Sequence, residues 1–185
     1  MRELYQTERL TIREWSEADA SDLFEYCSCK ETTKYLSFPT YTKMEEARER
    51  MKDREALYQA YGGHPGPNAD WAITVKDESK AIGSIGFAGW DKANATAEIG
   101  YVLNSKYQKH GYMTEAVIGL LQYIKKHHKR LGIAKIESKC DVANTASKGV
   151  MERAGMQYQC ILPGGTSNNT NQAADAYVYS LTIEI

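Results

Sequence analysis

Apolar and polar residues alternate along several stretches of the chain with the two-residue period of half-buried β-strands. Leu10 and Ile12 are the apolar members of the first stretch. Two later stretches flank a polar turn at 77–80, and this arrangement predicts a β-hairpin. The strands expected in this half of the chain are 7–15, 71–76, 81–87 and 96–103. We therefore expect a meander of antiparallel strands.

Apolar residues at helical spacing predict four helices. The first begins at Ser16, whose spacing to Asp19 approximates a capping box, and the second begins at Thr42, with Glu45 three residues later. The glycine- and proline-rich loop 62–67 ends the second helix. The expected helices run from Ser16 to about Cys29, from Thr42 past Tyr58, from the loop at Gly111 to Gly132, and from Asn144 to Ala154.

The segment 96–140 predicts a strand, a helix and a second strand, the last at 133–140. Two such strands are parallel and are joined by a right-handed crossover. Two final strands, at 157–161 and 177–183, flank a polar loop at 163–174. The expected fold class is therefore α/β, with a mixed, mostly antiparallel central sheet, one parallel crossover and flanking helices.

The composition fits one domain covering residues 1–185, long enough to bury roughly 70% of the surface of its unfolded chain. The chain has 23 Lys and Arg against 24 Asp and Glu, so bulk charge gives no reason to expect nucleic-acid binding. The four cysteines form no C-x-x-C pair, and we expect no metal site. Without a secretory leader or a membrane-length apolar run of ~20 residues, we expect a soluble, cytoplasmic protein.

The loop between the strand 96–103 and the long helix is the first candidate for chemistry. A helix that opens directly after a strand leaves backbone N–H groups free at its positive end, where a phosphate or pyrophosphate binds well. A dinucleotide fingerprint would need three glycines at G-x-G-x-x-G spacing, and only Gly111 is present. The loop is therefore predicted to bind an anionic cofactor of another kind.

The order Gln108-x-x-Gly111-x-Met113 resembles the acetyl-coenzyme A loop of the GCN5-related N-acetyltransferases (GNAT superfamily), although Met113 replaces a residue that is usually small. Further segments resemble the RimJ/RimL branch of that superfamily, in the same order and at about the same spacing. They are Thr7–Arg13 with Glu17–Ala20, Ala97–Tyr101, Gly111–Ala116, and Asn144-x-x-Ser147 leading into Val150–Met156.

The resemblance implies a GNAT fold, in which two central strands splay apart and the pantetheine arm of acetyl-coenzyme A pairs with strand backbone in the gap. Tyr101 and Val102 are then expected to offer main-chain partners, and Gly100 either starts a bulge at the splay or allows close helix packing. Backbone amides from Lys109 to Met113, with Gln108 and Tyr112 in the same loop, are expected to bind the pyrophosphate. Lys109 and His110 either add positive charge there or are simply solvated.

Three residues are candidates for catalysis. Asn144 and Ser147 have a structural explanation as helix-cap residues, but the resemblance implies that Asn144 contacts the cofactor arm and that Ser147 donates a proton to the departing thiolate. Strand parity places Glu98 on the face opposite Ala97 and Ile99, where it is either a solvent-facing residue or the group that takes the acceptor's proton. Cys140 is expected to be a buried strand residue rather than a nucleophile.

We therefore expect an N-acetyltransferase that moves an acetyl group from acetyl-coenzyme A to a primary amine by direct attack in a ternary complex. The resemblance favours the N-terminal α-amine of a protein, of the ribosomal-protein type, over a polyamine, amino acid or antibiotic. The segments 35–41 and 163–174 are expected to decide the acceptor. A non-catalytic acyl-coenzyme A sensor is the alternative of another class, and a homodimer is left open.

Overall fold

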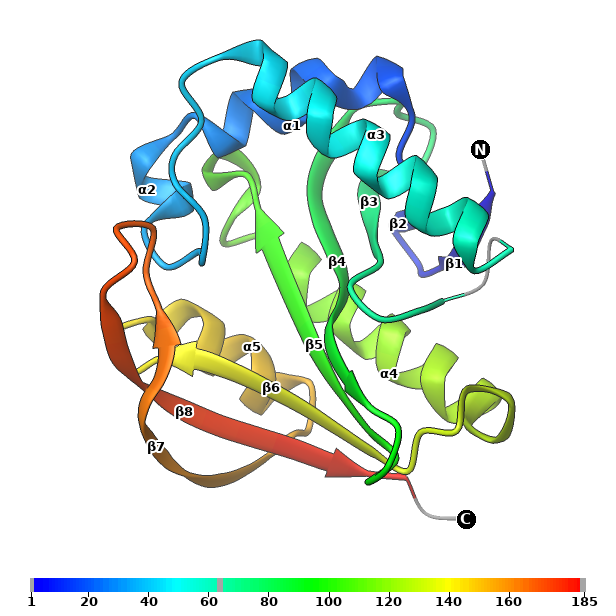
Figure 1. The fold of residues 1–185 in the computed structure, drawn as a ribbon. Coiled ribbons are helices and arrows are strands. Elements are labelled where there is room, and N and C mark those ends of the chain that lie inside the picture. The colour runs from blue at the N-terminus through cyan, green and yellow to red at the C-terminus, as the bar shows by residue number, and fades with distance from the viewer. Residues whose placement is uncertain (1, 63–64, 184–185) are drawn as a thin grey trace.

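The computed structural model describes residues 2–62 and 65–183, so His64 of the predicted loop 62–67 lies outside the described residues. The described strands form one sheet in the order β1-β2-β3-β4-β5-β6-β8-β7 (Figure 1). Their bounds are β1 Glu3–Gln6, β2 Leu10–Arg13, β3 Asp70–Val75, β4 Ala81–Asp91, β5 Thr96–Leu103, β6 Lys135–Asp141, β7 Gln157–Ser167 and β8 Ala173–Thr182.

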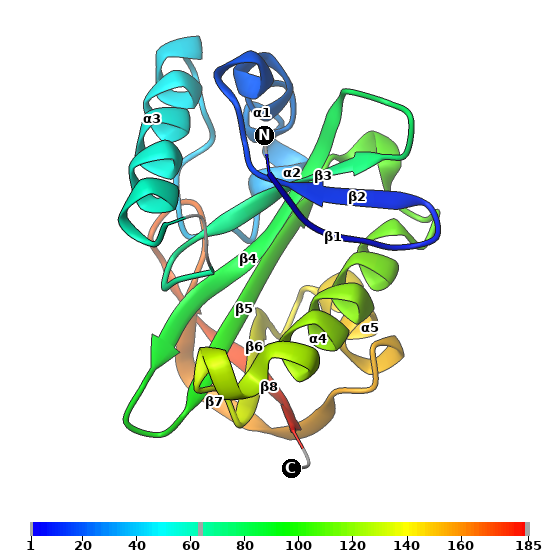
Figure 2. The same cartoon turned by 90° about the vertical axis from the view of Figure 1, so that its right-hand side faces the viewer.

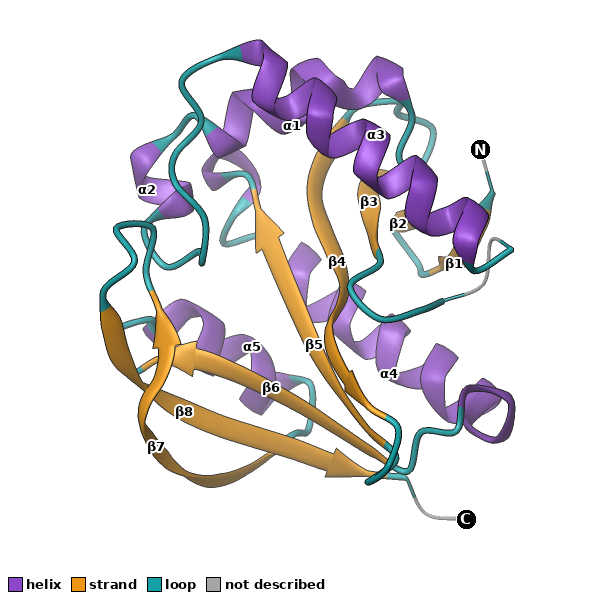
Figure 3. Cartoon of the chain, in the orientation of Figure 1, coloured by secondary structure: helices purple, strands orange, loops and turns teal. Residues whose placement is uncertain are grey.

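Helices cover both faces of this sheet (Figure 3). They are α1 Ala20–Cys27, α2 Lys30–Thr33, α3 Met44–Ala60, α4 Tyr112–Leu131 and α5 Thr145–Arg153, with short 3₁₀ helices η1 Glu17–Asp19 and η2 Ser105–Tyr107. Figure 2 shows α3 on one side of the sheet and α4 and α5 on the other. The apolar face of α4 is fully buried against the sheet, through Ala116, Val117, Leu120 and Ile124. None of the described helices has the length and apolar character needed to cross a membrane.

The predicted parallel crossover is confirmed, and so is the splay. Strands β5 and β6 are parallel, and they pair only from Thr96 opposite Lys135 to Glu98 opposite Glu137. Beyond that point they diverge, as the two arrows in Figure 1 show. The hydroxyl of Ser138 donates to the carbonyl of Ile99 at 3.1 Å, which bridges the start of the gap. The sheet therefore opens between its two central strands.

The bulge at this position lies in β4 and not at Gly100. Gly100 stays in register opposite Gly86, whereas the register of β4 shifts between Phe87 and Gly89. An added Cβ at Gly100 would lie 3.4 Å from the Cβ of Ala88, the extra residue of the bulge. Of the two explanations considered for Gly100, a bulge at the residue itself is therefore wrong, because the irregularity lies in the neighbouring strand.

The single strand predicted at 7–15 is also wrong in its extent. The chain forms two short strands, β1 and β2, and residues 7–9 make the turn between them. Thr7 closes this turn, because its backbone N–H donates to the carbonyl of Leu10 at 2.9 Å. The sequence 3–6 has little apolar alternation, and its pairing with β2 depends on tertiary contacts such as that of the Tyr5 hydroxyl with the Ala116 carbonyl, at 2.7 Å.

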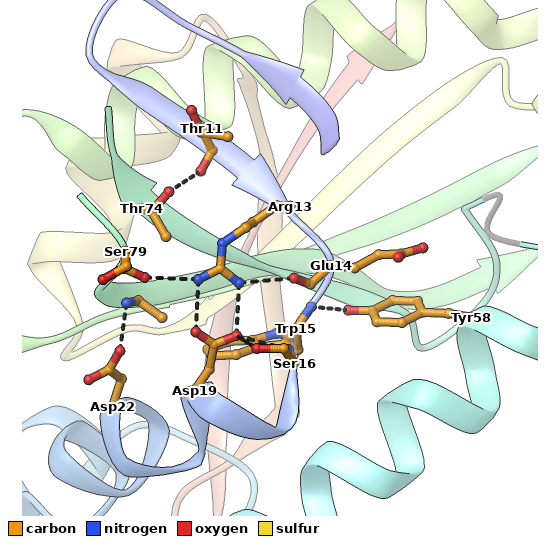
Figure 4. A network of polar contacts seen from close by, with 11 residues as sticks. Thr11, Arg13, Glu14, Trp15, Ser16, Asp19, Asp22, Tyr58, Thr74 and Ser79 are labelled. Carbon is orange, nitrogen blue, oxygen red and sulfur yellow. Dashed lines mark hydrogen bonds and ion pairs between the residues drawn. The ribbon is translucent and has the colours of Figure 1, made fainter. Parts of the chain in front are cut away.

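The capping box predicted at Ser16 and Asp19 is confirmed, and Asp19 also forms an ion pair with Arg13. The Asp19 carboxylate accepts from the backbone N–H of Ser16 at 2.8 Å and also from two nitrogens of Arg13, each at 2.8 Å (Figure 4). Both members of the ion pair are nearly buried. Hydrogen bonds from Arg13 and Ser16 lower the pKa of Asp19 below its ordinary value, although burial alone would raise it. The pair ties β2 to the start of the first helix.

Two element boundaries differ from those predicted: the start of α3 and the extent of the final hairpin. The second long helix, α3, begins at Met44 rather than Thr42, because the Glu46 carboxylate accepts from the backbone N–H groups of Thr42 and Lys43 at 2.7 Å each. The final hairpin is longer than predicted, since Thr166 and Ser167 still pair with β8. Much of the segment predicted as the polar loop 163–174 is therefore strand.

Candidate active site

The loop before α4 has the backbone geometry of an anion site. Lys109 and Gly111 both adopt left-handed conformations, with φ of 67° and 81°, and α4 begins at the next residue, Tyr112. Successive residues of this kind turn their N–H groups toward one point, and the first amides of a helix have no partner within the helix. This geometry is compatible with the predicted role of the amides from Lys109 to Met113 in binding a phosphate group.

The side chains of Gln108 and His110 contact main-chain carbonyls in or next to the loop. The Gln108 amide donates to the carbonyl of Leu103 at 3.3 Å, at the end of β5, and His110 Nδ1 lies 2.8 Å from the carbonyl of Gln108. Lys109 and His110 are exposed. Met113 points inward and is 6% exposed, so its large side chain does not occupy the outer surface of the loop.

Hydroxyl groups of β5 and α5 meet beyond the last paired residue of β5. Tyr101 of β5 extends its side chain to α5, where its hydroxyl lies 3.0 Å from Ser147 Oγ and donates to the Ser147 carbonyl at 3.2 Å. Burial raises the pKa of Tyr101 to about 12, despite the hydrogen bond with Ser147. The phenol is therefore a neutral donor at physiological pH. Only a main-chain role was predicted for Tyr101, since nothing local in the sequence indicates where its hydroxyl points.

Asn144 is the N-cap of α5, as its structural explanation predicted. Its side-chain oxygen accepts from the backbone N–H of Ser147 at 3.1 Å, which fixes the first turn of the helix beside Tyr101. Cys140 lies just before this turn, is 5% exposed, and has a thiol whose pKa is raised by burial. The prediction of a buried strand cysteine is confirmed, and a raised thiol pKa disfavours a nucleophilic role.

Glu98 lies at the last paired position of β5 and β6, on the face opposite Tyr101. Its carboxylate forms an ion pair with Lys139, at 2.7 Å between Oε2 and Nζ. Because this contact uses Oε2, Oε1 can still accept a hydrogen bond from water or from an amine. Glu98 and Lys139 line a groove of about 390 Å³ with Lys135 and Glu137. Lys139 was not identified from the sequence, because its contact spans 41 residues.

The two segments expected to decide the acceptor come together. Asn169, in the turn between β7 and β8, donates from Nδ2 to Thr40 Oγ1 at 3.2 Å. Tyr35 belongs to the same segment as Thr40, 35–41. Its hydroxyl donates to the carbonyl of Ala143, next to the start of α5, at 3.2 Å. The turn between β7 and β8 and the segment around α2 both lie toward the ends of β5 and β6 that diverge (Figure 1). The segments 35–41 and 163–174 therefore border the same opening of the sheet.

The structure thus separates the predicted residues into two sides of one gap. Tyr101, Asn144 and Ser147 form one hydrogen-bonded group with the first turn of α5, and Glu98 lies on the other face of β5, paired with Lys139.

Known proteins share this sequence and architecture. A family model described as an acetyltransferase (GNAT) domain matches residues 9–157. An uncharacterized N-acetyltransferase, p20, of Bacillus licheniformis is 32% identical over 181 residues, covering 98% of this chain and 96% of its own. The solved structure of RimL, a ribosomal alpha-N-protein acetyltransferase in complex with coenzyme A, superposes with a TM-score of 0.81 at 22% identity, over 98% of both chains. A microcin self-immunity acetyltransferase, MccE, in complex with acetyl-CoA and AMP, gives a TM-score of 0.80 at 22% identity, over 95% of this chain and 93% of its own.

Proposed function

The chain belongs to the GNAT family of N-acetyltransferases, and we propose that it acetylates the N-terminal α-amine of a protein with acetyl-coenzyme A as donor. The observation that carries this proposal is the gap between β5 and β6, which begins after Glu98 and is flanked by the anion loop of α4. Strand edges in the gap supply main-chain partners for an extended arm, and the loop supplies amides for its pyrophosphate. Both features fit acetyl-coenzyme A.

The residues of the gap can divide the proton transfers between them. An acceptor amine must lose a proton to attack the thioester carbonyl, and the departing sulfur must be protonated or stabilised. We assign the first task to Glu98, acting through water, and the second to the hydroxyl of Ser147. Asn144 and Tyr101 keep Ser147 in place. Because the amine attacks directly, Cys140 carries no acyl group.

The acceptor is proposed from the chemistry of the two segments that border the opening. Neither 35–41 nor 163–174 contains an Asp or a Glu, whereas hydroxyl and amide side chains are abundant. A polyamine would require several carboxylates to balance its charges, and the two glutamates of the nearby groove, Glu98 and Glu137, are already paired with Lys139 and Lys135. The amides of a peptide are suited to neutral donors and acceptors. RimL acts on a ribosomal protein and MccE is an immunity acetyltransferase, but at 22% identity both share only the fold with this chain. The site itself therefore favours a peptide.

An acceptor screen tests this assignment. We expect acetyl transfer to peptides with free N-termini to exceed transfer to spermidine, free amino acids and aminoglycosides, and we expect N-terminal blocking of the peptide to abolish it. Product mass spectrometry would place the acetyl group on the α-amine rather than on a lysine side chain. Inactive peptides alongside rapid turnover of a small amine would reverse the order of the two acceptor classes. Tight binding of acetyl-coenzyme A with no transfer to any amine would instead indicate a sensor.

The role of Ser147 gives a separate prediction. We expect Ser147→Ala to lower kcat about 10- to 100-fold, the lower range for loss of an acid–base group, because a thiolate is already a fair leaving group. The Kd for acetyl-coenzyme A should change little. Thr145→Ala is the matched control, since Thr145 is an exposed hydroxyl in the same helical turn. If Ser147→Ala is fully active and Tyr101→Phe is not, the proton comes from the phenol, and Ser147 is only its hydrogen-bond partner.

A further inference from the structure

Two of the sequence motifs that lie far apart in the chain bind each other. The turn between β1 and β2 carries Thr7 and Arg9, and the first turn of α4 carries Glu115. One carboxylate oxygen of Glu115 accepts from the Thr7 hydroxyl at 2.6 Å and from the backbone N–H of Arg9 at 2.8 Å. The other oxygen accepts from Arg9 Nε at 2.7 Å. All the contacts connect the N-terminal hairpin to the helix that follows the anion loop.

Arg9 also reaches the loop itself. Its Nη1 donates to the carbonyl of His110 at 3.0 Å, and its guanidinium lies 4.7 Å from the centre of the Tyr112 ring. A Cβ added to Gly111 would lie 3.4 Å from Arg9 Nη2. Arg9 therefore packs against three consecutive residues of the loop. Its bond to the His110 carbonyl fixes the peptide whose other end is the N–H of Gly111.

We propose that Arg9 and Glu115 form a positioning pair that holds the anion loop in its binding conformation before acetyl-coenzyme A arrives. This inference rests on the proposed role of the loop in cofactor binding. The pair binds no part of the substrate; it acts by reducing the number of loop conformations that must be lost on binding. Preorganisation of this kind increases affinity, because the ordering cost is met during folding.

The loop has a physical need for such a pair. Lys109 holds φ at 67° without being a glycine, a conformation that residues with a Cβ rarely adopt. Loop residues 108–111 are all exposed, so core packing cannot hold them. The Glu115 side chain is only 18% exposed, and hydrogen bonds from Thr7 and Arg9 lower its pKa, although burial would raise it. The carboxylate is thus ionised at neutral pH and is held in place by its hydrogen bonds to Thr7 and Arg9.

The direct alternative is that Arg9 contacts a phosphate itself. Arg9 lines a groove of about 790 Å³ with Gly111, Thr114 and Arg153, and its side chain is 44% exposed. However, Nε and Nη1 are both committed to protein acceptors, and the positive charge is balanced by Glu115. The two roles differ in what happens when Glu115 is neutralised. If Arg9 contacts the phosphate itself, loss of the Glu115 charge would leave a net positive charge there and acetyl-coenzyme A would bind more tightly. If Arg9 and Glu115 are a positioning pair, the same change would break the pair and weaken binding.

A double-mutant cycle on the full chain separates these roles without the need for an acceptor. We would measure the Kd of acetyl-coenzyme A by calorimetry for wild type, Arg9→Gln, Glu115→Gln and the double variant. We expect each single variant to weaken binding about 10-fold and the double variant to be no weaker than either, because partners in one network are non-additive. Amide hydrogen exchange in the free protein should be faster at residues 110–113 in all three variants.

The matched control is Asp19→Asn, which neutralises another Arg–carboxylate pair of the same N-terminal region, Arg13–Asp19, away from the loop (Figure 4). It should lower Tm yet leave the Kd and the exchange at 110–113 unchanged. Unchanged Kd in Glu115→Gln, or tighter binding in Glu115→Gln with weaker binding in Arg9→Gln, would overturn the positioning role. If Gly111→Val also binds normally, the cofactor site itself is misplaced, and the proposed function of the loop fails with it.

Discussion

Gly111→Val is expected to weaken acetyl-coenzyme A binding by ~100-fold or more. Gly111 has a φ of 81°, which a β-branched residue adopts only with strain, so the loop must change its backbone conformation to accept valine. That change turns amides away from the pyrophosphate. Hydrogen bonds to charged groups contribute about 1.5–3 kcal/mol each, and loss of two of them gives this factor or more. Calorimetric titration with acetyl-coenzyme A measures the effect directly.

The chain offers a close control at the other end of the same helix. Gly132 ends α4 with a φ of 66°, and within the described part of the chain no atom beyond its immediate chain neighbours lies within 4 Å of the position where its Cβ would be. Gly132→Val therefore introduces comparable backbone strain far from the loop. It should lower Tm by a similar amount and leave the Kd unchanged. Gly111→Asn adds a second comparison, because asparagine tolerates left-handed conformations, and it should retain more affinity than valine.

Loss of affinity in both glycine variants would attribute the effect to a weakened helix α4, and the anion site would lose its support. Normal affinity in a folded Gly111→Val protein would do the same. Circular dichroism and Tm measurements establish which of the variants are folded. The prediction is thus carried by the difference between two strained glycines and not by either one alone.

The sequence predicted the features that depend on local period. Strand β5 was expected at 96–103 and is found there, because alternation and a preceding turn mark it clearly. The parallel crossover to β6 follows from strand–helix–strand order and from the handedness rule. The cap of α5 by Asn144 is also a local effect, between residues three apart. These elements position the loop, and so its place between β5 and α4 could be predicted from the sequence.

The missed features depend on contacts between distant residues. Glu115 meets Arg9 across 106 positions and Glu98 meets Lys139 across 41, and no periodic pattern encodes such pairs. Strand β1 is short and only half-buried, so its position comes from its partners rather than from its own composition. Parity correctly placed Tyr101 with Ile99 on one face. It could not reveal that α5 supplies Ser147 to the phenol, because that depends on how the helix packs.

Glu98→Gln is expected to lower kcat/KM about 100-fold near neutral pH, within the range measured for loss of an acid–base group. Glutamine keeps the size of the side chain and its ability to hydrogen-bond, but it cannot accept a proton. An N-terminal amine has a pKa near ~8 and is mostly protonated at neutral pH. The variant should therefore recover part of its activity as the pH rises and the free amine becomes abundant. The measurement is kcat/KM against pH with the best acceptor found in the screen.

Glu137→Gln provides the control that separates catalysis from surface charge. Glu137 lies opposite Glu98 in the sheet and forms a similar ion pair, with Lys135 at 2.7 Å. Both glutamates line the same groove at the last paired position of β5 and β6, but only Glu98 is assigned the acceptor's proton. We expect Glu137→Gln to keep near wild-type activity at every pH. Equal losses of kcat/KM in the two variants would show that the groove acts only through its charge. If wild type and Glu98→Gln gave pH profiles of kcat/KM with the same shape and height, Glu98 would have only a structural role, in its ion pair with Lys139.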